Sequence, residues 1–346
     1  MIRNRMLLIV MIMMVGTAAL SEPAFAGDRL TNVGTTSAAF LEVGIGARSM
    51  GMGGAFVAVA NDATAMYWNP AGLSRVHQMS GIFEQVQWVT DIQFNFLAAS
   101  IPVGGIGGTM GVFVNSMSIP DQPVRTVQYP QGNGEQYSAS GLAAGLSYAR
   151  NLTDRFSIGA NAKYCSERIW HEKATSIAFD IGTLYETGLE GLFIGACISN
   201  FGPGLKLDGS DLLIYHDPDP IHLGNNDKII GKLMTSDWPL PLNMQFGLSY
   251  TLSLADALQM TFAADALHPI NASESMNVGA EIKLLNLLYL RSGYKGLFLE
   301  ESEEGLSMGA GLYYKLFGSS NIHVDYAYTD MGRFGGISRF TLGLGL

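Results

Sequence analysis

The sequence predicts an all-β membrane protein, an antiparallel outer-membrane β-barrel of about 14 strands with an N-terminal plug (hatch) segment. Apolar residues alternate with polar or small ones from about residue 79 to the last residue, as between Leu242 and Leu252, and this period separates the two faces of a strand. An export signal precedes this region. No later apolar run is long enough for a spanning helix, so the chain must cross a membrane as closed strands.

Residues 1–26 have the three parts of a signal peptide. Arg3 and Arg5 form a positive start, residues 6–19 are apolar, and residues 24–26 read Ala-Phe-Ala, a typical cleavage site. The apolar part is shorter than the roughly 20 residues that a membrane anchor needs. We therefore expect a cleaved signal and not a retained anchor.

Composition limits the class of protein further. Charged residues make up 14% of the chain, below the roughly 25% of soluble domains, and 42 residues are Gly, as a lipid-facing belt and tight turns would require. The net charge of −10, without a basic stripe, argues against nucleic-acid binding.

The segment 27–78 is rich in Gly, Ala and Ser and alternates little. Residues 47–56 read A-R-S-M-G-M-G-G-A-F, residues 61–63 read N-D-A, and residues 68–73 read W-N-P-A-G-L. Together these motifs resemble the start of the PorV/PorQ family, within the wider FadL-like group of outer-membrane barrels. The remainder of the chain is similar to that family in architecture and not by motif. The resemblance implies a fourteen-stranded barrel with this segment folded inside as a hatch.

Residue types in the hatch motif fit a confined interior. Glycines allow close backbone approach and unusual dihedral angles, an Asn can satisfy local backbone groups, and a Pro fixes a turn. The expected hatch residues are Arg48, Gly51, Gly53, Gly54, Asp62, Asn69, Pro70, Ala71 and Gly72. The same glycines faintly resemble a dinucleotide loop, but the sixth position of each window is not Gly and no βαβ unit surrounds them.

The barrel is expected over residues 79–346. Its strands are expected near residues 80–90, 91–103, 106–118, 138–149, 153–167, 173–187, 190–201, 242–253, 255–267, 275–285, 286–295, 304–315, 319–329 and 337–346. Short connections alternate with longer ones, as the periplasmic turns and external loops of such barrels do. The longest connection, residues 202–241, is rich in Pro and Asp, and we expect either an external lid or partner-binding loop or plain surface disorder there.

The last strand ends the chain with apolar residues on one face, from Phe340 to Leu346. It must pair with the first strand to remove the sheet edge. It is also similar to the signal that the outer-membrane insertion machinery recognises, although the final residue is Leu where an aromatic residue is usual. An outward aromatic girdle is expected from Tyr250, Tyr289, Tyr294, Tyr313, Tyr314, Tyr326 and Tyr328.

Side chains in the opposite register should face the lumen and hold the hatch. These lumen-facing candidates are Asn243, Gln245, Asp265, Asn277, Glu281, Lys283, His323 and Asp325. The six His residues have no metal-ligand spacing, and the sequence carries no persuasive catalytic constellation. We therefore expect a protein of the bacterial outer membrane that is no enzyme and uses no cofactor and no metal.

The resemblance leaves two functions open, besides a purely structural role. PorV-like members act in type IX secretion, which implies secreted cargo proteins as partners of external loops 202–241 and 119–137. FadL-like relatives take up hydrophobic small molecules, which implies a hydrophobic ligand. The inward faces of the strands read as polar on the whole, which modestly disfavours an oily tunnel, although the hatch can supply an apolar pocket. Either function implies outer-membrane lipid and the insertion machinery as further partners.

Overall fold

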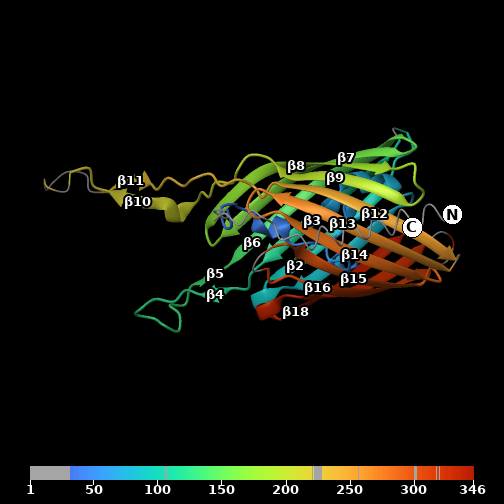
Figure 1. Cartoon of the computed structure of the whole chain (residues 1–346). Helices are drawn as coiled ribbons and strands as arrows, with labels where there is room; N and C mark the ends of the chain where they lie inside the picture. The colour runs from blue at the N-terminus through green and yellow to red at the C-terminus, as the bar shows by residue number, and fades with distance from the viewer. Residues whose placement is uncertain are drawn as a thin grey trace, which may run out of the picture. The chain divides into compact units, whose positions relative to one another are not determined.

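Fourteen strands of the described residues close into one antiparallel barrel, in which β1 pairs with β18 (Figure 1). The barrel strands are β1 (Ser80–Gln87), β2 (Gln93–Pro102), β3 (Thr109–Ser118), β6 (Ala139–Thr153), β7 (Phe156–Ile169), β8 (Glu172–Glu186), β9 (Leu192–Phe201), β12 (Asn243–Ala255), β13 (Leu258–Pro269), β14 (Ser275–Leu284), β15 (Leu288–Leu297), β16 (Leu306–Lys315), β17 (Asn321–Asp330) and β18 (Gly336–Gly345). The predicted fourteen-stranded antiparallel barrel is therefore confirmed.

The computed structural model describes residues 32–346 except 106, 220, 222–227, 256, 300, 301, 317 and 319. The predicted signal peptide over residues 1–26 lies outside the described residues. None of the helices described is long and apolar enough to cross a membrane.

The outer face of the barrel is apolar and its inner face is buried. Along β18, Phe340 and Leu342 are 59% and 47% exposed, whereas Arg339 and Thr341 between and beside them are 1% and 3% exposed. A ring of large exposed apolar side chains on a closed barrel is the lipid-facing belt of an outer-membrane protein. The chain is accordingly a protein of the bacterial outer membrane.

The two longest connections, residues 119–138 and 202–242, lie at the outer end of the barrel, as predicted. The predicted alternation of short and longer connections holds only in part, because the β7–β8 turn at the outer end has two residues and the β2–β3 connection at the other end has six. At the outer end, the long connections carry two small sheets, β4 (Gln122–Pro123) with β5 (Gln136–Tyr137) and β10 (Leu213–His216) with β11 (Ile229–Lys232) (Figure 1). Among the described residues, three connections at this end also hold a 3-10 helix each: η3 (Val89–Asp91) between β1 and β2, η4 (Ser210–Leu212) in the longest connection, and η5 (Gly332–Phe334) between β17 and β18. The sequence predicted only loops where the two small sheets form.

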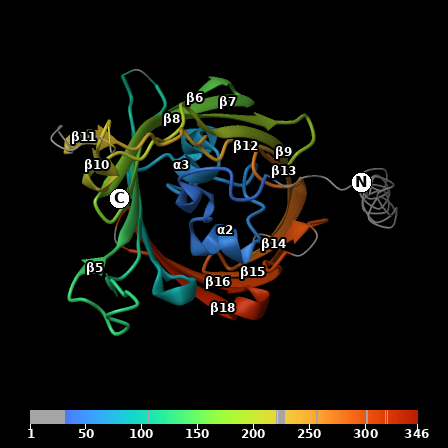
Figure 2. The ribbon, with the colours of Figure 1, turned by 90° about the vertical axis from the view of Figure 1, so that its left-hand side faces the viewer.

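Residues 38–76, called the inner segment below, lie inside the ring of strands (Figure 2). The inner segment contains η1 (Ala39–Glu42), α2 (Ala47–Gly51), α3 (Ala65–Trp68) and η2 (Pro70–Arg75). Helices of four to six residues have little stability of their own in water, so contacts with the barrel wall must hold these. The contacts between the inner segment and the barrel wall therefore form the candidate site.

Candidate functional site

Glycines line the wall where the inner segment touches it. A Cβ on Gly279 or Gly293 would overlap the Met52 backbone, and one on Gly159 would overlap the backbone of Pro70. The Cβ of Gly195 would lie 2.7 Å from the Val57 carbonyl oxygen. The missing side chains therefore make room for backbone on backbone, which explains part of the high glycine content that the sequence analysis assigned to turns.

Arg48 joins α2 to the neighbouring part of the barrel wall through a chain of buried charges. Its Nε and Nη2 donate to Glu281 of β14 at 3.0 Å each, and its Nη1 donates to Asp62 at 3.2 Å. Glu281 also accepts from Arg291 Nε at 2.7 Å, and Arg291 Nη1 donates to Asp325 at 2.5 Å. We call Arg48, Asp62, Glu281, Arg291 and Asp325 the ion chain. Each carboxylate in it has a cation beside it, as burial requires.

A second set of anchors lies at the seam between β1 and β18. Glu84 accepts from the Gly46 backbone N–H at 2.7 Å, and Thr341 accepts from that of Ala47 at 2.8 Å. Arg339 donates to the Gly44 carbonyl at 2.6 Å. The stretch 44–47 is therefore held by both strands that close the barrel.

The middle of the inner segment is held by a carboxylate of β13. Asp265 accepts from the backbone N–H groups of Phe56 at 2.7 Å and Val57 at 2.9 Å. Its side chain is 1% exposed, and a carboxylate that receives two N–H bonds in such a place fixes the backbone tightly.

Asn69 makes three hydrogen bonds at the W-N-P-A-G-L end, two of them buried and one partly buried. Its Nδ2 donates to the carbonyls of Val57 and Thr183, at 2.9 and 3.0 Å, and its Oδ1 accepts from the Ala71 N–H that opens η2. Asn69 thus joins two parts of the inner segment to β8, which accounts for this residue type in the motif.

Replacing Asn69 by Asp tests these bonds with almost no change in shape. Asp keeps the acceptor for Ala71 but removes both donor bonds, so we expect the inner segment to be held more weakly by on the order of 2 kcal/mol. Amide hydrogen exchange of residues 57–75 should become roughly 30-fold faster. Asn133→Asp, in an external loop, should leave this exchange unchanged, and equal exchange in both variants would contradict the role given to Asn69.

The other predicted site residues have these positions. Gly53 and Gly54 have φ of 66° and 74°, Gly51 packs against Gly309, and Gly72 packs on the Ala60 carbonyl. Asn243, Gln245 and Lys283 lie in the inward register of β12 and β14, partly exposed and without a bond to the inner segment among the described residues. Asn277 Oδ1 instead accepts from the Gly296 N–H at 2.9 Å.

Two tyrosines of the expected outward girdle face the lumen instead. Tyr313 stacks on His323 with ring centroids 4.6 Å apart, and the Arg291 guanidinium lies 5.4 Å from the Tyr289 ring. Both side chains therefore border the ion chain and not the lipid. His323, a lumen candidate, lies 3.8 Å from Asp325.

Sequence reasoning missed several buried lumen charges. Arg291, Glu84 and Arg339 are among them, and so is a pair in the wall in which Lys163 Nζ donates to Asp180 at 2.8 Å. The sequence signal for these positions is a charged residue in the inward register of a strand.

Large apolar side chains gather on one side of the lumen, although the sequence predicted inward faces that are polar on the whole. The inward residues of β1, β2, β3 and β6 that belong to the buried clusters are Ile82, Val86, Phe94, Phe96, Ala98, Phe113, Ala143 and Ala149. Between them the same strands carry the buried polar residues Glu84, Ser100, Thr109, Asn115 and Ser147. The wall residues of the ion chain lie on β14, β15 and β17 instead. We call the eight clustered apolar residues of β1, β2, β3 and β6 the apolar side of the lumen.

The apolar side runs between the two ends of the barrel. Toward the outer end, Phe40 and Leu41 of the inner segment share a buried cluster with Leu205 and Leu240 of the long connection. At the other end, Val76 borders a hollow of about 270 Å³ next to the short β2–β3 turn. The apolar side thus consists of two buried clusters, one toward each end, and the hollow beyond the second is lined mainly by polar residues such as His77, Arg150 and Asn151.

External loops close over the start of the inner segment. The Ser37 N–H donates to the Pro239 carbonyl at 3.0 Å, and Asn271 donates to the Glu42 carboxylate at 3.1 Å. Burial raises the pKa of the Glu42 carboxyl above its ordinary value, and the bond from Asn271 acts in the opposite direction. The described residues contain no group of three or more His, Cys, Asp or Glu side chains that could hold a metal ion.

Comparisons by sequence give no relatives. No family model matches the chain, and no curated protein matches it.

Solved structures do resemble the barrel. The toluene transporter TodX of Pseudomonas putida aligns with a TM-score of 0.56 at 13% identity, over 87% of this chain and 97% of its own. The toluene transporter TbuX of Ralstonia pickettii gives 0.52 at 14%, over 87% and 97%, and the monoaromatic hydrocarbon channel CymD gives 0.53 at 14%, over 88% and 97%. At such identities the likeness establishes the fold alone, the barrel of FadL-like channels, and gives no support to PorV/PorQ in particular.

Proposed function

We propose that this chain is a channel that lets hydrophobic small molecules cross the outer membrane. The observation that carries the proposal is the apolar side of the lumen, whose residues form one buried cluster toward the external loops and a second toward the periplasmic end. The toluene and monoaromatic hydrocarbon channels with the same fold support it. This is the uptake function that the sequence analysis gave as the alternative to secretion.

The two sides of the lumen hold the inner segment by different forces. On the polar side the ion chain and Asp265 make directional bonds. On the apolar side the contacts of residues such as Met66 and Leu73, which pack against Gly111 of β3, are nondirectional, and a hydrocarbon can replace them at little cost. We therefore infer that the inner segment acts as a hatch that stays anchored on β13, β14 and the β1–β18 seam while a ligand passes along β2 and β3.

Uptake by whole cells tests this function. A bacterial strain without hydrocarbon channels of its own would express the chain and receive a radiolabelled monoaromatic hydrocarbon. We expect uptake several-fold faster than in cells with an empty vector, and no gain for a sugar of similar size.

Phe96 provides the matched variants, because it is 1% exposed on the apolar side. Phe96→Glu should return uptake to the vector level, since a buried carboxylate repels an apolar solute, whereas Phe96→Leu should retain most of it. Uptake is normalised to the folded barrel, measured by its heat-dependent gel mobility. Folded protein without faster uptake would reject the proposal.

Secretion remains a second candidate because of one feature. The β10–β11 sheet at the outer end exposes Tyr215 and Ile230 on one face, 75% and 68% respectively, and a protein partner could cover them. Deletion of residues 213–232 should abolish capture of exported proteins if secretion is the function, and should leave hydrocarbon uptake intact if it is not.

The final strand supports a further proposed partner. Phe340, Leu342 and Leu344 point to the lipid side, and β18 pairs with β1 at the closing seam. We propose that the insertion machinery recognises β18, which truncation of residues 340–346 would test through loss of membrane insertion.

A further inference from the structure

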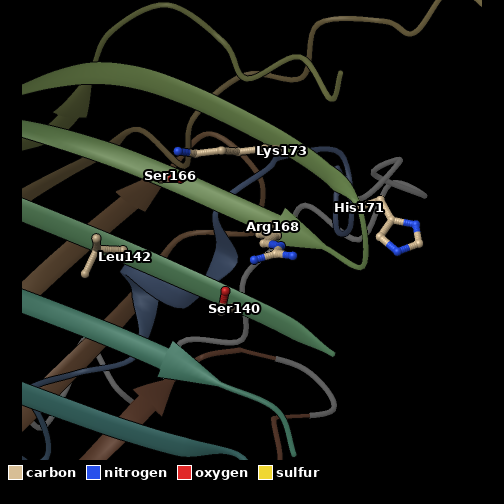
Figure 3. Close-up of a pocket in the computed structure, with 6 residues that line it drawn as sticks. All are labelled: Ser140, Leu142, Ser166, Arg168, His171 and Lys173. Atoms are coloured by element: carbon tan, nitrogen blue, oxygen red, sulfur yellow. The ribbon is translucent and has the colours of Figure 1, made fainter. Parts of the chain in front are cut away.

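A basic hollow lies on the lipid-facing side of the wall, at its outer end. It has a volume of about 390 Å³ and is lined by six residues of β6, β7, β8 and the β7–β8 turn: Ser140, Leu142, Ser166, Arg168, His171 and Lys173 (Figure 3). These residues take no part in the lumen described above. The hollow therefore needs its own explanation.

Strand register arranges the side chains in rows. Ser140 pairs with Arg168, and Arg168 pairs with Lys173, so these three lie abreast on one face. Paired neighbours of adjacent strands are about 5 Å apart, close enough for the two cations to meet one anion. Arg168 Nε already donates to the Trp170 carbonyl at 2.9 Å, which leaves its two terminal nitrogens to bind.

The next rows become apolar with depth. Leu142 and Ser166 pair one row below the cations, and two rows further the exposed residues are Leu146 and Phe179. Rows on one face are about 7 Å apart, so the cations lie above a wall that faces acyl chains. An anion bound there would thus be the headgroup of a lipid whose chains cover the rows below.

Charge in the hollow favours an anion. Among the described residues, no ion pair joins the side chain of Arg168 or Lys173 to a carboxylate, whereas His171 Nδ1 lies 3.0 Å from Asp211. Asp208 of the long connection is paired with Lys232 instead. Arg binds phosphate through a planar fork and Lys binds it as a point charge. Arg168 and Lys173 are therefore suited to phosphate, and neither has an ion pair with a carboxylate among the described residues.

We propose that this hollow binds the phosphate group of an outer-leaflet lipid, with Arg168 and Lys173 as its ligands. Ser140 supplies a hydroxyl donor in the row of the two cations, and Ser166 supplies one in the row below. Leu142 and the apolar rows below contact the acyl chains. The site fixes the depth of the barrel in the membrane on the side of β6–β8.

Lipid binding to the full-length protein in a non-ionic detergent tests the proposal. Native mass spectrometry would follow a titration with lipid A that carries two phosphates, with the same lipid after removal of its phosphates, and with inorganic phosphate. Arg168→Gln with Lys173→Gln should weaken lipid A binding by roughly tenfold or more, since each cation near an anionic surface contributes to binding.

Arg155→Gln with Lys315→Gln is the matched control, because both are exposed at the opposite end, Arg155 in the β6–β7 turn and Lys315 as the last residue of β16. It should bind lipid A as the unmodified protein does, and the dephosphorylated lipid should bind the unmodified protein as weakly as lipid A binds the first variant. Heat-dependent gel mobility verifies that both variants are folded. Equal binding by the two variants, or inorganic phosphate that displaces lipid A at equal phosphate concentration, would overturn the proposal.

Discussion

Gly279→Val should release the inner segment from the barrel wall. The new side chain would overlap the Met52 carbonyl, and the backbone cannot move aside as a flexible side chain can. We expect the packing of the inner segment to weaken by about 3 kcal/mol. Arg48, which is buried in the ion chain, would then become accessible to trypsin, and cleavage after it should be roughly 100-fold faster.

Gly81→Val is the control for this experiment. A Cβ at Gly81 would meet only the Ala98 carbonyl oxygen at 3.8 Å, an ordinary contact. Cleavage after Arg48 should therefore stay slow in Gly81→Val. Slow cleavage in both variants, with both barrels folded, would show that the wall tolerates side chains there and that the glycines do not determine the packing.

Arg291→Met should cost more stability than any other single change in the ion chain. Arg291 is bonded to Glu281 and Asp325, and its side chain is 0% exposed. Glu281 would keep Arg48, but Asp325 would keep only a long contact from the Tyr313 hydroxyl at 3.5 Å and His323 at 3.8 Å among the described residues. A buried charge without its partner costs about 3–5 kcal/mol, and the free energy of unfolding in lipid vesicles should fall by that amount in a guanidinium titration.

The partner substitution separates charge from packing. Asp325→Asn in the Arg291→Met background removes the unpaired carboxylate, so the double variant should recover most of the lost stability. If the double variant is as unstable as Arg291→Met, the loss comes from the cavity left by the guanidinium and the ion chain contributes little.

Alternation predicted the strands because each barrel strand has one face in lipid and one in the lumen. It did not predict the face of every residue. Tyr313 and Tyr314 are adjacent, so only one of them can face lipid, and aromatic type alone cannot decide which. The neighbouring ion chain decides it, because the Tyr313 hydroxyl lies 3.5 Å from Asp325.

The site was less predictable than the strands. Arg48 and Glu281 lie 233 positions apart in the chain, and only the closed barrel brings them together. Residue type marked both as candidates, but their pairing needs the register of several strands. Wall glycines such as Gly279 were hidden for the same reason, because their partner Met52 lies far away in sequence.

The anchors at the seam have a consequence for biogenesis. Arg339 and Thr341 lie 295 and 294 positions after Gly44 and Ala47, which they hold, so they are synthesised much later than their partners. A barrel without the inner segment would leave Glu84 and Arg339 facing each other across the β1–β18 seam, without the backbone groups of Gly44 and Gly46 to bond. Closure of the β1–β18 seam and binding of the inner segment are therefore a single late event. An assembly intermediate should lack both the closed seam and the bound inner segment.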